Sequence, residues 1–283
     1  MSSQRKIVDE RDDQALKSCC ANVYQSEWAR LLLGDSFHPG GTALTAYLGA
    51  ALRLGSGQRV LDVAAGQGTS AIHLAQRFGC SVLGIEYSRV AVERAIQAAQ
   101  KASVAHLVTF EQGDAEQLSV PAASFDVVLC ECAFCTFPNK AMAASEFVRV
   151  LSPGGRLGLS DLTRTGKIPA ELQGLLAWIA CIADAQPLEN YVQYLVEAGL
   201  TIRLVEQHDE ALTGMVRAIQ AKLLGTELLV KLNKITLPGE IDVEQAKTMA
   251  KMAATAIQAR QFGYAIIVAT RAEEQSDPTQ GGH

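Results

Sequence analysis

Between Gln58 and Ser160, segments typical of buried strands alternate with segments whose apolar residues have helical spacing. Strands that alternate with helices in this way pair in parallel, because each helix carries the chain back across one face of the sheet. The sequence therefore predicts an α/β fold, a doubly wound sheet with helices on both faces. The segments that carry this pattern are strands at 58–63, 81–86, 108–112, 125–129 and 156–160 and helices at 69–78, 90–101 and 140–151.

The rest of the chain is expected to be mainly helical, with two more strands that complete the sheet. The spacing of apolar residues predicts helices at 15–33, 42–54, 171–183, 188–198, 208–232 and 243–261, and the two strands at 201–207 and 264–271.

These segments divide the chain into three parts. We interpret residues 1–56 as an N-terminal helical cap or lid. Residues 57–271 form one α/β domain, and the helices at about 208–262 are a helical insertion between its last two strands. We expect residues 272–283 to be a disordered tail.

The charge balance limits the partners. The chain has 30 acidic and 25 basic residues, a formal net charge of −5 and no long run of either sign. Binding to nucleic-acid phosphates needs a basic surface, which this composition does not provide. The start from Met1 to Asp13 is too polar for a signal peptide, and the longest dense apolar stretch, 175–183, is about half a membrane span. We expect a cytoplasmic protein with a small-molecule partner and neither a nucleic-acid nor a membrane partner; the oligomeric state stays open.

A glycine-rich loop follows the first strand of the pattern and leads into its first helix. Gly66 and Gly68 would let a ligand approach the backbone, with the N–H groups at the helix start facing it. A tight turn that needs glycine for geometry alone is the alternative. Acidic residues also lie at the ends of the first three strands, namely Asp62, Glu86 and Asp114. Each could cap a helix, but three in register at one sheet edge indicate a ligand site.

The three carboxylates suit a ligand with an amino-acid head, a ribose and an adenine. Asp62 would attract an ammonium group and repel a pyrophosphate. Glu86 would accept hydrogen bonds from ribose hydroxyls, and Asp114 would accept one from the exocyclic amine of adenine. That ligand is S-adenosylmethionine rather than NAD. We assign three neighbouring residues to the same site: Tyr87, Ala115 and Cys130.

These acids occur with two further stretches, Phe125-Asp-Val-Val-Leu129 and Arg149-Val-Leu-Ser-Pro-Gly-Gly155. Together with Asp62-x-x-x-Gly66-x-Gly68, this combination resembles the class I S-adenosylmethionine-dependent methyltransferases over residues 57–161. Ala64 departs from the pattern, since the family commonly carries a glycine there. The resemblance implies a Rossmann-like, seven-stranded sheet whose last strand is antiparallel, and S-adenosylmethionine as the cofactor. It implies nothing about the methyl acceptor.

The chain contains seven cysteines, an odd number that predicts reduced thiols rather than disulfides. Three of them, Cys130, Cys132 and Cys135, follow the fourth strand at the edge where ligands bind in open α/β sheets. They could simply pack beneath the cofactor. Without a nearby histidine or a second Cys-x-x-Cys pair, they do not fit a structural zinc site, and we predict no structural metal. Thiolates prefer soft centres such as trivalent arsenic, whose lone pair can attack a methyl sulfonium without a general base.

A second resemblance concerns these thiols. The segment 125–137 is similar to the part of arsenite methyltransferases in which a cysteine follows the fourth strand, and Cys132 falls on that cysteine. Ala180-Cys-Ile-Ala-Asp-Ala185 is similar to the family's Cys-Ile/Val-x-Gly-Ala stretch, with Cys181 on its cysteine and Asp184 in place of its glycine. Ala71 stands where many members have a third arsenic-binding cysteine.

The resemblance implies arsenite as the first candidate for the acceptor. Cys132 and Cys181 would be its main ligands. The third thiol would be Cys135 or one of the adjacent Cys19 and Cys20, which are similar to paired N-terminal cysteines of some members. A thiol reductant is compatible with this chemistry.

Two other functions stay open. An organic acceptor that attacks through carbon, nitrogen or oxygen would need a positioned base, for which His38 and Glu131 are the candidates. A thiol-based metal sensor on a methyltransferase-like scaffold would bind a soft metal without transferring a methyl group. Affinity for S-adenosylmethionine separates the sensor from the two enzymes.

Overall fold

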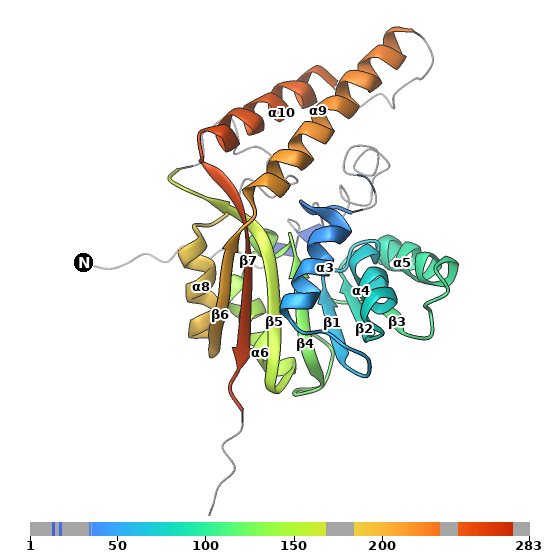
Figure 1. The fold of residues 1–283 in the computed structure, drawn as a ribbon, viewed down its shortest axis with the longest axis vertical. Coiled ribbons are helices and arrows are strands. Elements are labelled where there is room, and N and C mark those ends of the chain that lie inside the picture. The colour runs from blue at the N-terminus through green and yellow to red at the C-terminus, as the bar shows by residue number, and fades with distance from the viewer. Residues whose placement is uncertain are drawn as a thin grey trace, which may run out of the picture.

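The computed structural model describes residues 13–14, 17–18, 34, 36–167, 184–232 and 243–273. In these ranges the chain forms a seven-stranded sheet with the order β3-β2-β1-β4-β5-β7-β6 (Figure 1). The strands are β1 Arg59–Val63, β2 Ser81–Glu86, β3 Val108–Gln112, β4 Phe125–Glu131, β5 Leu151–Arg164, β6 Leu200–Gln207 and β7 Phe262–Arg271.

Strand pairing confirms the predicted fold class. The pairings among β1 to β5 are parallel, whereas β7 lies between β5 and β6 and is antiparallel to both. The central strands β1 and β4 are mostly buried, as expected inside a sheet covered on both faces, and their sequences are mainly apolar, interrupted by Asp62 in β1 and Asp126 in β4. The edge strand β6 instead alternates exposed with less exposed residues, because side chains of successive residues point to opposite faces.

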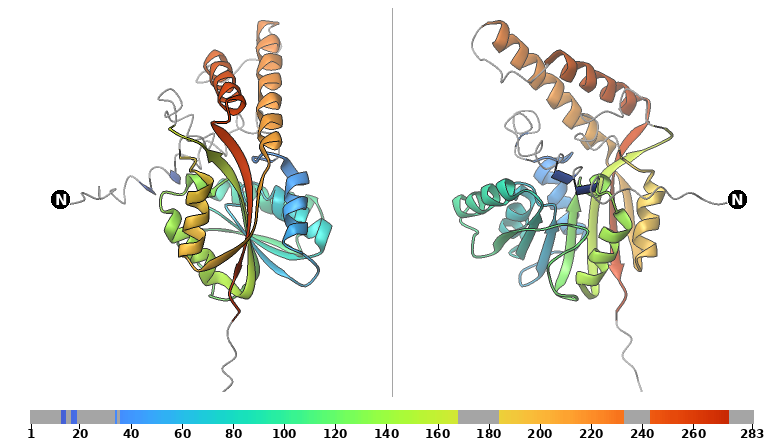
Figure 2. Two further views of the ribbon diagram at one scale, coloured as in Figure 1. Left: turned by 60° about the vertical axis from the view of Figure 1, so that its left-hand side comes forward. Right: turned by 180° about the vertical axis from the view of Figure 1, so that it is seen from behind.

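Helices cover both faces of the sheet (Figure 2). On one face lie α3, α4 and α5, and on the other lie α6 and α8. The helices are α3 Gly41–Ala51, α4 Thr69–Phe78, α5 Arg89–Lys101, α6 Lys140–Val150, α8 Leu188–Glu197, α9 Asp209–Lys231 and α10 Val243–Gln258, with a short 3-10 helix η1 at Phe134–Thr136.

β5 is longer than the sequence predicts. The stretch 152–155, which lies between the predicted helix at 140–151 and the predicted strand at 156–160, is already part of β5, since Leu151 pairs with Phe125 of β4. Beyond Ser160 the strand continues to Arg164, because β7 offers it a partner up to Phe262. The ends of a strand depend on its pairing with neighbouring strands, and the local sequence pattern carries no information about that pairing.

The helical insertion between β6 and β7 consists of α9 and α10, which pack on each other and project from the sheet edge at which β6 ends (Figure 1). The base of α9 is tied to the first part of β7. The backbone N–H of His208 donates to the carbonyl of Tyr264 at 2.6 Å, and the N–H of Tyr264 donates to Asp209 Oδ1 at 3.0 Å. No helix in the described parts of the chain is both long and apolar enough to cross a membrane.

The sequence calls for a cap at 1–56 and a tail at 272–283, and the structure covers these segments in part. The predicted helix at 15–33 falls almost entirely outside the described residues, as do residues 274–283. The predicted helix at 171–183 is also outside them. These parts of the domain division stay predictions.

The position of α3 depends on a close approach to the sheet. A side-chain carbon at Gly158 of β5 would come within 2.6 Å of Leu52 Cδ1 and 3.1 Å of Leu48 Cδ1. Both leucines are fully buried. The absence of a side chain at Gly158 therefore lets α3 pack closely against β5.

We predict that Gly158→Ala lowers the free energy of unfolding by about 1–3 kcal/mol, the usual cost of overfilling a packed core. Gly214→Ala in α9 is the matched control, because an added Cβ there meets no atom within 4 Å. That change should leave stability unchanged or raise it by up to about 1 kcal/mol. Urea denaturation followed by circular dichroism measures both, and equal stability of the two variants would contradict the packing argument.

Candidate active site

A pocket opens at the carboxyl ends of β1, β2 and β4, where the strand order reverses direction. We call it the sheet-edge pocket. Residues from the glycine loop, from three strand ends and from the loop before α3 line it. They include Asp62, Ala64, Gly66, Gln67, Glu86, Tyr87, Asp114, Ala115, Glu131 and Cys132, together with Lys17, His38, Thr69 and Ser70.

Asp62 is the most buried acid of the pocket wall. Its side chain is 2% exposed, and its Oδ2 atom has no hydrogen-bond partner among the described residues. Burial, and then the negative charges of Glu131 and Glu86, raise the pKa of Asp62 well above its usual value. A buried carboxylate oxygen without a donor is costly, so this atom fits a ligand that brings an ammonium or another N–H donor.

Glu86 holds the glycine loop. Its Oε2 accepts a hydrogen bond from the Gly66 N–H at 2.9 Å, and its Oε1 accepts one from the Ser88 N–H at 2.8 Å. Burial raises the pKa of Glu86, while the N–H groups of Ser88, Gly66 and Tyr87 oppose this rise. The side chain therefore links the end of β2 to the loop after β1, on the wall of the pocket.

The loop has left-handed backbone at three positions, with φ of 60° at Ala64, 56° at Gly66 and 80° at Gly68. A side-chain carbon at Gly68 would also collide with the ring of Phe110. Ala64 is the residue that departs from the family pattern, in which a glycine is common at this position. Its φ is one that glycine adopts readily and that costs alanine roughly 1–2 kcal/mol, yet the fold holds it there.

Asp114 is paired with the N-terminal segment. Lys17 Nζ lies 2.8 Å from Asp114 Oδ2 and 2.5 Å from Glu116 Oε2. Burial lowers the pKa of Lys17, but the hydrogen bonds and charges of the two acids outweigh it and raise that pKa overall. The other oxygen, Asp114 Oδ1, accepts the N–H of Glu116 at 2.9 Å. Lys17 could not be singled out from the sequence, because the ion pair joins residues nearly a hundred positions apart.

The clustered cysteines point in different directions. Cys132 has a left-handed φ of 53°, lines the pocket and donates its N–H to Ser160 O at 2.7 Å. Cys130 is fully buried in the core, where burial and then the charges of Asp161, Asp62 and Glu131 raise its thiol pKa well above the usual value. Of the thiols in the described part of the chain, Cys132 alone lines the pocket.

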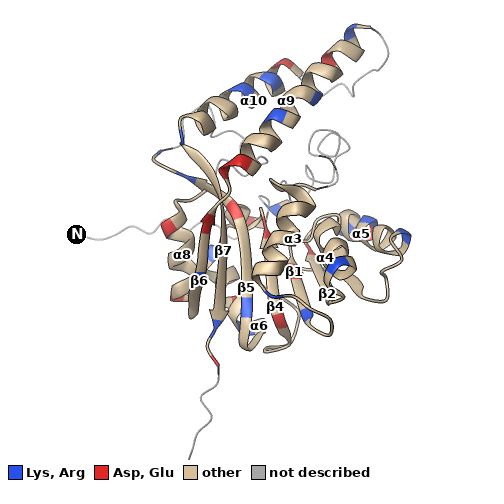
Figure 3. Ribbon diagram, in the orientation of Figure 1, with Lys and Arg blue, Asp and Glu red and all other residues tan. Residues whose placement is uncertain are grey.

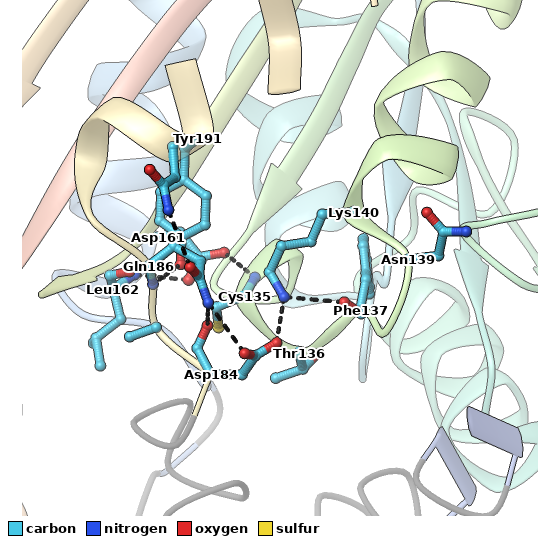
Figure 4. Close-up of polar contacts among 12 residues, drawn as sticks. Cys135, Thr136, Phe137, Asn139, Lys140, Asp161, Leu162, Asp184, Gln186 and Tyr191 are labelled. Atoms are coloured by element: carbon cyan, nitrogen blue, oxygen red, sulfur yellow. Dashed lines mark hydrogen bonds and ion pairs between the residues drawn. The ribbon is translucent and has the colours of Figure 1, made fainter. Parts of the chain in front are cut away.

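Cys135 lies on η1 beside Asp161 and Tyr191 (Figure 4); it is fully buried and does not line the pocket. Its N–H donates to Asp161 Oδ2 at 2.9 Å, on the side of Tyr191. The three remaining predicted thiols, Cys181, Cys19 and Cys20, lie outside the described residues. No group of three or more histidine, cysteine or acidic residues in the described ranges is arranged to hold a metal ion.

Lys140, next to η1, gives a physical reason for Asp184. The Lys140 ammonium is buried; it pairs with Asp184 and donates to the carbonyl of Phe137 at 3.0 Å (Figure 4). A glycine at 184 would leave this buried cation without its carboxylate. The departure from the arsenite methyltransferase pattern is therefore a structural ion pair.

A cluster of four polar side chains forms another part of the wall. Ser70 Oγ donates to Glu131 Oε2 at 2.6 Å, and Thr45 Oγ1 donates to the same atom at 3.0 Å. His38 Nε2 lies 3.6 Å from Glu131 Oε2 and 3.3 Å from each hydroxyl oxygen. The sequence singled out His38 and Glu131 separately. It missed Thr45 and Ser70, because the four residues come from four separate segments.

Beneath this wall lies Tyr264 of β7. Its hydroxyl is 3.0 Å from Ser160 Oγ, and the side chain is fully buried. Burial, and then the charges of Cys132, Glu131 and Asp161, raise the pKa of Tyr264 well above its usual value. The phenol therefore stays protonated as a hydrogen-bonding group under the pocket.

A doubly wound sheet of this strand order, with a ligand pocket under a glycine loop at its switch point, defines the class I methyltransferase fold. The chain belongs to the methyltransferase domain family, whose sequence pattern matches residues 54–200, more than half of the chain.

Three known proteins illustrate the relationship. The 27-O-demethylrifamycin SV methyltransferase of Amycolatopsis mediterranei is 36% identical over 162 residues, which is 56% of this chain and 60% of that protein. The arsenite methyltransferase of Halobacterium salinarum is 27% identical over 203 residues, 68% of this chain and 52% of that protein. The chain thus spans about half to three fifths of the length of these relatives.

The third is a solved structure, the phosphoethanolamine N-methyltransferase 2 of Haemonchus contortus in complex with S-adenosyl-L-methionine. It superposes with a TM-score of 0.75 at 19% identity, over 95% of this chain and 61% of that one. At this identity the likeness shows the fold alone. Family and fold predicted from the sequence are confirmed.

We predict that Asp62→Asn stabilises the ligand-free protein at pH 8 by about 1–2 kcal/mol, because it removes a buried charge without a donor. The pKa of Asp62 is raised by folding, so its contribution to stability is complete below the unfolded pKa and is lost as pH rises through the folded pKa. The advantage of the variant should therefore grow between pH 5 and pH 8.

Thermal unfolding at the two pH values measures this, with Glu111→Gln as control because Glu111 is an exposed acid on β3. If the Asp62→Asn variant is no more stable than the parent at pH 8, the buried charge of Asp62 must already be offset by other groups in the ligand-free protein.

Proposed function

We propose that the chain is an S-adenosylmethionine-dependent methyltransferase for a small molecule. The observation that carries this proposal is the buried Oδ2 of Asp62, which has no hydrogen-bond partner in the described part of the chain and lines the same pocket as Glu86 and Asp114. Three carboxylates around one pocket favour a cation, and S-adenosylmethionine carries both an ammonium and a sulfonium group.

Each acid has a part of that ligand to hold. Asp62 would accept from the ammonium, and Glu86 would accept from the ribose hydroxyls while keeping its bonds to the loop. Asp114 would accept from the adenine amine beside Lys17. Gly66 and Gly68 would let the ligand approach the backbone, and Tyr87 and Ala115 would line the same site. S-adenosylmethionine supplies an electrophilic methyl group when it is bound.

The first candidate for the acceptor is an organic hydroxyl. Ser70 and Thr45 orient the carboxylate of Glu131, and His38 lies beside it. The single hydroxyl hydrogen of Thr45 favours Oε2 at 3.0 Å over Oε1 at 3.3 Å, so Oε1 is the oxygen that would take the acceptor proton. His38 Nε2 lies 3.6 Å from the other oxygen, Oε2, and would help to position the carboxylate from that side. The relative named as a methyltransferase of 27-O-demethylrifamycin SV supports this choice.

The second candidate is the metalloid that the sequence favours. The support for this candidate is Cys132, because its thiol lines the pocket and its backbone has a strained, left-handed conformation. Arsenite would need one or two more sulfurs, from among Cys181, Cys19 and Cys20 outside the described residues, and a thiol reductant would fit the same chemistry. Cys135 is buried behind the wall and would have to turn toward the pocket.

Cofactor binding is the first test. We predict that the parent protein binds S-adenosylmethionine in calorimetry and that Glu86→Ala weakens binding by about 1.5–3 kcal/mol, roughly a 10- to 150-fold rise in Kd, through lost charge-assisted hydrogen bonds. Glu86→Gln keeps the shape of the side chain and separates ribose binding from support of the loop. The exposed Glu111→Ala should bind like the parent. Absence of affinity in the parent would contradict the proposal and favour the thiol-based sensor.

Acceptor chemistry is the second test, and two variants separate the candidates. Glu131→Gln should lower the rate with a hydroxylated acceptor about 100-fold or more, since it removes the base. Cys132→Ser should abolish methylation of arsenite and leave cofactor affinity nearly intact. Each variant is incubated with arsenite plus thiol and with a panel of phenols and alcohols, and the methylated products are measured by mass spectrometry. Arsenite turnover that survives Cys132→Ser would end the metalloid candidate, and hydroxyl turnover unaffected by Glu131→Gln would end the base assigned here.

A further inference from the structure

The far half of α9 carries three leucines that are largely exposed. Leu224, Leu228 and Leu232 lie four residues apart, so they follow one side of the helix toward its end. Their side chains are 59%, 57% and 57% exposed. A single exposed leucine is ordinary on a protein surface, whereas a row of them on one helix face indicates an interaction surface.

The first half of the same side of α9 is built from small residues. Gly214, Ala218 and Ala221 continue the spacing of three or four residues, and all three are exposed. A side-chain carbon added at Gly214 would meet no atom within 4 Å. The opposite side of α9 is buried at Val216 and Leu223, and α10 packs against this helix. We call the side that the three small residues share with the three leucines the α9 outer face.

Charged residues mark the two ends of the α9 outer face. Glu210 lies in the first turn of α9 and Lys231 in its last turn, and both are exposed. Figure 3 shows acidic positions at the start of α9 and a basic position at its far end. Lys231 also pairs with Glu227 of its own helix. Arg217 and Lys222 are exposed on either side of the face. The face is thus acidic where its residues are small and basic where they are large.

The two halves of the face fit each other in size when two copies of α9 lie antiparallel with Ala221 at the centre. At 1.5 Å per residue, Gly214 lies about 10 Å before Ala221 and Leu228 about 10 Å after it. Leu228 of each copy therefore falls on Gly214 of the other copy. Leu224 and Ala218, three residues to either side of the centre, meet in the same way. A large side chain thus meets a small one at each position, which close packing requires.

The charges favour the same antiparallel arrangement. Glu210 lies eleven residues before Ala221 and Lys231 ten residues after it, so the two come to the same height on neighbouring copies. A parallel pair would instead place like charges together and leucine on leucine, and it would leave a gap at Gly214. A face whose two halves match in size and in charge fits a second copy of the same chain.

We propose that the α9 outer face is a homodimer interface, in which two copies pair through antiparallel α9 helices about a two-fold axis near Ala221. The 23 residues of α9 span about 35 Å, so the paired helices hold the two α/β domains at opposite ends of the contact. An interface made by one pair of helices is small, and the dimer therefore dissociates on dilution. This inference does not depend on the proposed function.

Sedimentation of the full chain over a concentration series tests the interface. We expect the parent to change from monomer to dimer as its concentration rises. Leu228→Lys should raise the dissociation constant of the dimer about tenfold or more, because it replaces an apolar contact near the centre of the interface by a charge. The matched control is Val196→Lys on α8, where the side chain is 50% exposed outside α9. That variant should dimerise like the parent.

Cysteine cross-linking tests the antiparallel arrangement. Ala221→Cys places a thiol beside the two-fold axis, so mild oxidation should join residue 221 of one copy to residue 221 of the other. Gly225→Cys is the matched control. Its two thiols would lie about 12 Å apart along an antiparallel pair, too far for a disulfide, but side by side in a parallel pair. Peptide mass mapping identifies the linked residues, because the chain has seven cysteines of its own.

The proposal is overturned if the parent stays monomeric at every concentration or if Leu228→Lys dimerises like the parent. It is also overturned if Gly225→Cys cross-links to itself as readily as Ala221→Cys, since the helices would then be parallel. A monomer that binds anionic phospholipid vesicles, and loses this binding in Leu228→Lys, would assign the α9 outer face to a membrane surface instead.

Discussion

Three carboxylates, Asp62, Glu86 and Glu131, are buried around one pocket, and the surrounding structure follows from how each is supplied with donors. A carboxylate that loses water costs several kcal/mol unless hydrogen bonds replace it. Glu86 takes backbone N–H groups of the glycine loop, and Glu131 takes the hydroxyls of Ser70 and Thr45. The glycine loop, the start of α4 and α3 thus each provide a donor to one of these acids, through Gly66, Ser70 and Thr45. Among the described residues Asp62 Oδ2 has no donor, and the proposed cationic ligand rests on this atom.

The same wall contains the residues on which both proposed acceptor chemistries rest. At the end of β4, Glu131 and Cys132 are adjacent, one a hard oxygen base and the other a soft sulfur ligand. The hydroxyl network around Glu131 is complete within the described residues, whereas Cys132 needs sulfur partners from elsewhere. For this reason we favour an organic acceptor over the metalloid that the cysteine pattern indicates.

The sequence predicts the fold well because the fold depends on short periodic patterns. The strands β1, β2 and β3 and the helices between them lie within a residue or two of the predicted bounds. The gathering of Asp62, Glu86 and Asp114 at one pocket also follows from sequence, since carboxyl ends of parallel strands share an edge; their roles remain proposals.

The cysteine and histidine environments could not be predicted in this way. Two residues apart, Cys130 and Cys132 would share a face in a regular strand, but the left-handed backbone at Cys132 separates them. The contacts of His38 and Lys17 join distant segments and leave no local pattern.

The attachment of the α9–α10 insertion sets a rule for how its length can change. Both its ends enter neighbouring strands, and Asp209 fixes the N–H of Tyr264 at the start of β7. Residues inserted or deleted at the far end of the helical pair would leave the register of β7 intact. A single residue gained or lost between Gln261 and Tyr264 would instead shift that register and turn Tyr264 to the opposite face of the sheet. Natural variation in length should therefore be confined to the connection between α9 and α10. The junction with β7 should keep its number of residues as long as the hydrogen bond between Ser160 and Tyr264 is needed.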